Sequence, residues 1–140
     1  AVFQVPISLS APGIFTSDST GKGQAAALNQ DGITVNTAAN PAQSGDVISL
    51  FATGEGQTEP PGVDGRLAEA AILPRPRLPV SVLIGGVAAE ILYAGGAPGL
   101  VAGVLQVNAR VPESTPAGAR PIVLTVGNAS SQPGVTLAIR

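Results

Sequence analysis

The stretch LQVNARVP, residues 105–112, decides the fold class. Its apolar side chains alternate with polar ones from Leu105 to Val111, and an extended strand places successive side chains on opposite faces. An amphipathic helix would instead need apolar residues three and four positions apart. The stretch therefore predicts a β-strand with one buried face and one polar face.

The same two-residue period continues on both sides of this stretch. It recurs after it over 122–126 and 135–139, and before it residues 80–84 and 87–93 flank Gly85-Gly86, which predicts a hairpin. Residues 46–53 are almost continuously apolar, which is typical of a central strand.

Turn residues separate these segments throughout the chain. The 140 residues include 18 Gly and 13 Pro, scattered without a collagen-like period. Short apolar runs with such punctuation predict an all-β protein, an immunoglobulin-like β-sandwich of about eight or nine strands. We expect one sandwich domain over residues 11–140, preceded by an N-terminal extension strand over residues 1–10. The side chains expected to be buried are Phe51, Ile84, Ile91, Tyr93, Leu105, Val107, Leu124 and Leu137.

Two further expectations concern the remaining segments. Residues 24–29 and 32–36 flank Gln30-Asp31-Gly32, a plausible second hairpin. Residues 54–79 are rich in proline and charge, and predict a long surface loop with a helical turn at 67–71.

The composition excludes several classes of function. The chain has no Cys, His, Met or Trp, which removes thiol chemistry and the usual zinc ligands. A serine nucleophile would have to use Lys22, the only lysine, which lies between two glycines and is interpreted as a solvated turn residue. We therefore expect no enzyme, no cofactor and no metal. Seven Lys and Arg and a net charge of −2 argue against nucleic-acid binding, and no apolar stretch predicts membrane insertion.

The long loop holds the only dense group of carboxylates: Glu55, Glu59, Asp64 and Glu69. Their spacing matches no calcium loop, and a solvated acidic loop is the favoured interpretation. A polysaccharide is the alternative partner, although four aromatic residues offer little to stack on sugar rings. Asn128 begins an N-x-S sequon in a predicted turn; its glycosylation stays open.

The N-terminal residues suggest a partner. Phe3, Val5, Ile7 and Leu9 share one face of an alternating segment, and Pro6 restricts that segment to an edge position. Such a strand can complete the sheet of another subunit, and head-to-tail repetition of that contact gives an open fibre. The expected partner is a copy of this chain. Whether the strand pairs within its own domain or in a neighbour is left open by the sequence.

Most of the chain resembles a C-terminal domain family of large secreted acidobacterial proteins, of the Solibacter type. The matching stretches are APGIFT (11–16), GQAAALNQDG (23–32), NPAQSGDVISLFATGEGQTEPPGVDG (40–65), PVSVLIGGVAAEILYAGGAPGLVAGVLQVNARVP (79–112) and PIVLTVGNASSQPGVTLAIR (121–140). The second half is also similar to immunoglobulin-like domains of the IPT/TIG type. The acidobacterial resemblance implies export and a cell-surface setting, and implies no activity.

A chain that starts at Ala1 without an initiator Met also fits removal of a signal peptide, and hence a secreted protein. We expect an extracellular structural protein that assembles into a filament or surface layer by strand complementation. The alternative is a binding or spacer module that docks a polysaccharide or a protein at the end of a larger secreted protein.

Overall fold

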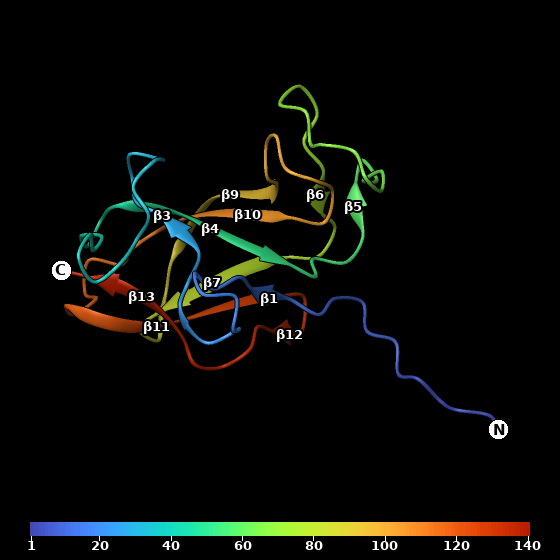
Figure 1. Ribbon diagram of the computed structural model, residues 1–140, viewed down its shortest axis with the longest axis horizontal. Helices are drawn as coiled ribbons and strands as arrows, with labels where there is room; N and C mark the ends of the chain where they lie inside the picture. Colours follow the sequence, from blue (N-terminus) through green and yellow to red (C-terminus); the bar gives the residue numbers. More distant parts are fainter.

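The computed structural model describes residues 1–140 and contains strands but no helix. Two sheets pack face to face with the core between them (Figure 1). The all-β class and the β-sandwich are thus confirmed. The structure has 13 strands rather than eight or nine, because seven of them are only two residues long.

The first sheet has the order β1-β4-β10-β9, with β3 pairing beside β1 on β4. All of its neighbouring strands run antiparallel. Its strands are β1 (Gly13–Ile14), β3 (Ala27–Leu28), β4 (Val47–Thr53), β9 (Glu90–Gly96) and β10 (Leu105–Arg110).

The second sheet has the order β2-β13-β11-β7-β8, and β12 pairs with the end of β11. Only the β2–β13 pair runs parallel. Its strands are β2 (Gly23–Gln24), β7 (Val80–Ile84), β8 (Val87–Ala88), β11 (Gly118–Val126), β12 (Ala129–Ser130) and β13 (Val135–Ile139).

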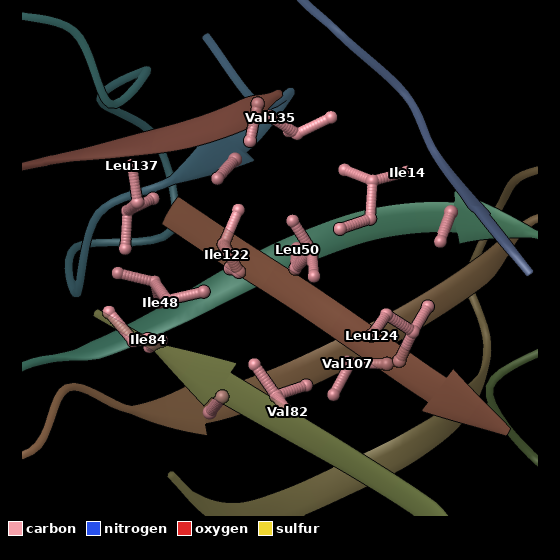
Figure 2. Packing of buried hydrophobic residues seen from close by; sticks show 14 of the residues in the cluster. Ile14, Ile48, Leu50, Val82, Ile84, Val107, Ile122, Leu124, Val135 and Leu137 are labelled. Carbon is pink, nitrogen blue, oxygen red and sulfur yellow. The ribbon is translucent and has the colours of Figure 1, made fainter. Parts of the chain in front are cut away.

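Alternation along the strands builds one core between the two sheets. From the first sheet, β4 and β10 contribute every second residue, and β7, β11 and β13 do the same from the second sheet (Figure 2). Burying each large aliphatic side chain is worth about 1.5–3 kcal/mol. The fully buried side chains include Ile48, Leu50, Val82, Ile84, Leu105, Val107, Ile122, Leu124, Val126, Val135 and Leu137.

Three of the eight residues expected in the core are only half-buried: Phe51, Ile91 and Tyr93. Phe51 lies on the outer face of β4, because the inward positions of that strand are those of Ile48, Leu50 and Ala52. Ile91 and Tyr93 lie on β9, which forms the edge of the first sheet. The other five expected residues are buried.

The predicted strand over 87–93 is in fact two strands. Gly85 and Gly86 form the expected turn, with φ values of 60° and 81° that favour glycine. Only Val87–Ala88 then pairs with β7, and after Ala89 the chain crosses to the first sheet and pairs with β10 as β9. The chain therefore changes sheets between β8 and β9.

The other two segment expectations are also corrected. The loop over 54–79 contains no helical turn; its residues form a separate ribbon of β5 (Thr58–Glu59) and β6 (Arg75–Pro76). Leu67 and Ala68 form single bridges with the 98–101 loop. The second predicted hairpin is reduced to short β3 and one bridge between Leu28 and Val35, because Gln24 pairs with β13 instead.

Side-chain amides bridge the two sheets along one edge of the sandwich. Asn36 is fully buried and donates to the Ala138 carbonyl of β13 at 2.9 Å, while its Oδ1 accepts from the Ala138 N–H at 2.9 Å. On the first sheet, the Asn36 N–H donates to the Ala27 carbonyl of β3. Gln132 similarly accepts from the Ile14 N–H of β1 and donates to the Ile14 carbonyl. We call this side, which Asn36 and Gln132 bridge, the closed edge.

Candidate functional site

The four apolar residues of the predicted assembly strand lie outside the sandwich. Phe3, Val5, Ile7 and Leu9 are each at least 78% exposed, and residues 1–9 pair with no strand. The segment projects away from the sheets (Figure 1). The buried face expected for this segment is therefore not formed within its own domain.

Residues 10 and 11, which we call the root of the segment, are hydrogen-bonded to the sandwich. Ser10 is buried and its hydroxyl donates to the Val126 carbonyl at 2.7 Å, and the Ala11 N–H donates to the Gly54 carbonyl at 2.9 Å. A Cβ at Gly54 would clash with the Ala11 carbonyl, and a Cβ at Gly56 with the Leu9 carbonyl. The chain at 9–11 thus crosses directly over two glycines, and the projecting segment ends at residue 9.

Opposite the closed edge, β9 forms the edge of the first sheet, and the first residues of β7, which β8 does not cover, lie at the edge of the second sheet. An apolar groove lies between them. A shallow cavity of about 280 Å³ lies here. We call it the open-edge groove; it is lined by Arg75, Pro76, Leu78, Val80, Ile91, Leu92, Tyr93 and Ala94. Leu78, Val80, Ile91 and Ala94 also pack against the core, so the groove reaches the side of the core.

The backbone of Ala94, in this groove, is unpaired. The Gly96 N–H donates to the Pro74 carbonyl, so Gly96 does not exchange hydrogen bonds with Leu105 opposite it. In an antiparallel ladder, residues two positions apart point their N–H and C=O groups to the same side. Ala94 lies two residues before Gly96, so its N–H and C=O also point away from β10. No neighbouring strand lies on that side of β9. The Ala94 backbone is therefore free to pair with another strand, whereas the Pro74 carbonyl already occupies the Gly96 end of this edge.

Tyr93 is the only tyrosine of the chain and lies in this groove. Its hydroxyl donates to the Gly96 carbonyl at 2.7 Å, and the Arg75 guanidinium lies 5.2 Å from the ring centroid. Burial raises the pKa of the Tyr93 phenol above its ordinary value of 10.0, and the positive charge of Arg75 partly opposes that rise.

The four loop carboxylates surround two neighbouring cavities of about 250 and 470 Å³. Glu55 lines both cavities, Glu69 lines the smaller one, and Glu59 and Asp64 line the larger one. Glu55 is only 7% exposed, unlike a residue of a solvated loop. No group of three or more carboxylates is arranged to hold a metal ion.

The remaining candidates lie on the surface. Lys22 is exposed in the loop before β2, and Asn128 is exposed in the turn between β11 and β12. Hydrogen bonds from Thr34 and Ile33 lower the pKa of the exposed Asp31 carboxyl, which caps the turn before Val35. The structure contains no helix that could cross a membrane.

The chain matches no family model, no curated protein and no solved structure. The resemblances to the acidobacterial domain and to the IPT/TIG type therefore stay predictions.

Sequence reasoning identified the alternating segment but missed its exposure, the open-edge groove and the low exposure of Glu55. The groove depends on which strands end at the sheet edges, which no local pattern encodes. A signal for Glu55 was present in Gly54-Glu55-Gly56, because two glycines around an acid indicate a close backbone approach.

Proposed function

We propose that this protein is an extracellular structural subunit that polymerises by strand complementation between copies. The observation that carries the proposal is the apolar segment 1–9, which is exposed along its length yet fixed to the sandwich at Ser10. An apolar face left in water is costly, and burying each large side chain is worth about 1.5–3 kcal/mol. A second copy can supply that burial.

The acceptor site we propose is the open-edge groove of the next copy. Residues 1–9 extended at about 3.3 Å each span roughly 30 Å, which is enough to run along the whole of β9. The donor's apolar face would cover the half-buried Val80, Ile91 and Ala94. Its backbone would pair with the free N–H and C=O of Ala94, which helps to offset the entropy lost when the segment is ordered.

This contact joins two different surfaces, so it does not close on itself. Each copy donates one segment and offers one groove, and repetition gives an open fibre unless the rotation happens to close a ring. The fixed root at Ser10 and Ala11 defines where the segment leaves each copy. Copies would therefore repeat at a constant spacing, as a filament requires.

The extracellular setting rests on the resemblance described above. Labelling of intact cells with an antibody against the sandwich tests it, and an antigen reached only after cell lysis would contradict it.

Deletion of residues 1–9 tests the assembly. We expect the full chain to form fibres in negative-stain micrographs, and the shortened chain to sediment as a monomer. The monomer should bind a synthetic peptide of residues 1–9 and should not bind a peptide in which Val5 and Ile7 are aspartate. Fibres that persist after deletion would contradict the proposal, as would a full chain that stays monomeric at high concentration.

Concentration dependence separates pairing between copies from pairing within one copy. If the segment folds back into its own groove, the mass stays that of a monomer at every concentration. Pairing between copies makes the mean mass rise with protein concentration.

A binding module is the second candidate function. It is favoured by the two cavities around Glu55, which a purely structural subunit does not need.

A further inference from the structure

Glu55 is an acid whose residue is mostly covered by protein, and its side chain lines both cavities around the loop carboxylates. It is 7% exposed, and its side chain makes no hydrogen bond and no ion pair; the one ion pair of the protein joins Arg110 to Glu90. The Thr115 hydroxyl oxygen is the only fully buried side-chain polar atom without a partner, so the Glu55 carboxylate is open to the cavities. A mostly covered carboxylate that no protein group pairs can gain from a cationic ligand placed in these cavities.

The protein holds the backbone of Glu55 in a fixed place. Gly54 has a φ of 84° and Gly56 a φ of 75°, and the chain at 9–11 lies directly against both. The Ala11 N–H bonds to the Gly54 carbonyl. Because the backbone on both sides of Glu55 is constrained, ligand binding there need not order the backbone.

The surroundings of Glu55 combine negative charge with aliphatic surface. The two cavities are lined by four carboxylates, those of Glu55, Glu59, Asp64 and Glu69, against the two guanidiniums of Arg66 and Arg77. The smaller cavity, of about 250 Å³, is also lined by Val63, Leu67 and Ile72. These three side chains are more than half exposed, and a ligand would cover them.

We propose that this cavity binds an organic cation, an ammonium group on a short aliphatic chain, with the ammonium against Glu55. Hydrogen bonds between charged groups are stronger than neutral ones, and the aliphatic part would contact Val63, Leu67 and Ile72. A metal ion is the poorer occupant, since no three carboxylates converge. The cavity is smaller than a typical site for a drug-sized molecule, which limits the ligand to a few heavy atoms or to one lysine-like side chain.

The site is separate from the proposed assembly contact. None of the residues that line these two cavities belongs to residues 1–9, and none lies on the part of β9 that faces the open-edge groove. Failure of one proposal therefore leaves the other standing.

Titration with n-butylammonium tests the proposal, with the full chain kept dilute. We expect saturable binding in the millimolar range by calorimetry, with shifts of the Gly62 and Ala102 amide signals, which line the cavity. Glu55→Gln keeps the shape and removes the charge, and should weaken binding at least about tenfold. Glu90→Gln is the matched control, because Glu90 lies outside both cavities, and should leave the affinity unchanged.

n-Butanol is the neutral ligand control, and it should bind at least about tenfold more weakly than n-butylammonium. Three results would overturn the proposal: no saturable binding of the cation, equal binding by n-butanol, or equal binding by a folded Glu55→Gln variant. The fold of that variant is checked by its far-UV spectrum and its unfolding midpoint.

Discussion

The two long edges of the sandwich differ in how the sheets meet: hydrogen bonds join them at one edge, and an apolar groove separates them at the other. At the closed edge, Asn36 and Gln132 join the sheets through hydrogen bonds to Ala138 and Ile14. At the open edge, β9 and the first residues of β7, which β8 does not cover, leave a groove lined by half-buried apolar side chains and the unpaired backbone of Ala94. Buried hydrogen bonds fix one arrangement of the two sheets at the closed edge. An apolar groove beside an unpaired strand edge can instead accept a strand from another chain.

The largest expected effect is at the closed edge. Asn36→Ala removes the amide that pairs with both backbone groups of Ala138 and with the side chains of Gln24 and Asn29. Each buried group left without a partner costs about 1–3 kcal/mol, so the free energy of unfolding should fall by about 3–5 kcal/mol. Urea unfolding measures it. Asn128→Ala, at an exposed turn, is the control and should change stability by less than about 0.5 kcal/mol.

Gln132→Ala opens the same edge less severely, because Gln132 is only partly buried and water can reach the freed groups. We expect a loss of about 1–2 kcal/mol. Hydrogen exchange at Ile14 should accelerate more than at Val107 in the core. A uniform acceleration at both amides would show that Gln132 does not act as a local bridge.

Ala94→Pro tests the open edge. Proline removes only the N–H that faces away from β10, and an edge strand tolerates proline at such a position. The free energy of unfolding should fall by less than about 1 kcal/mol, while fibre formation is lost. Fibres of normal abundance from this variant would mean that the donor strand does not pair with β9.

Val5→Asp with Ile7→Asp should leave the stability of the sandwich within about 0.5 kcal/mol, because both side chains are exposed. Assembly should nevertheless be abolished, since a charge cannot enter the apolar groove without a partner. Gln4→Asp with Ser8→Asp adds the same charge on the opposite face of the segment and should still assemble. Equal loss in both double variants would indicate general repulsion rather than a specific face.

The smallest expected effect is on the titration of Tyr93, which as the only tyrosine gives a clean absorbance signal. Burial raises the pKa of this phenol above 10.0, so its contribution to stability is present below pH 10 and falls as pH rises through the folded pKa. When the peptide of residues 1–9 fills the groove of the shortened chain, burial increases and the pKa should rise further. A pKa unchanged by a saturating peptide would exclude this groove as the acceptor.

The sequence predicted the strands that alternate regularly and are covered on one face, such as β10, where Leu105 and Val107 are buried as expected. It failed where pairing depends on partners distant in the chain. Nothing local distinguishes Val87–Ala88, which pairs with β7, from Glu90–Gly96, which crosses to the other sheet. Phe51 was assigned inward because its strand is apolar on both faces, and such a strand does not reveal which face is buried.

For the candidate sites too, the sequence predicted local patterns and missed contacts between residues distant in the chain. The alternation of Phe3, Val5, Ile7 and Leu9 could be read from the sequence, because a two-residue period is a local property, whereas their exposure could not. The role of Asn36 could not, since its partner Ala138 lies 102 residues away. Glu55 appeared to be one of four loop acids, and its low exposure depends on packing between distant parts of the chain, such as the approach of residues 9–11 to the neighbouring glycines.

The crossing at residues 9–11 also has a mechanical consequence. Ser10 is bonded to Val126 at the end of β11 and Ala11 to Gly54 just after β4, so the root of the segment is attached to both sheets at once. Tension applied through residues 1–9 is therefore shared between the two layers instead of peeling one strand from its sheet. In a fibre under load, the sandwich would resist as a single block, and the weakest link would be the contact between copies.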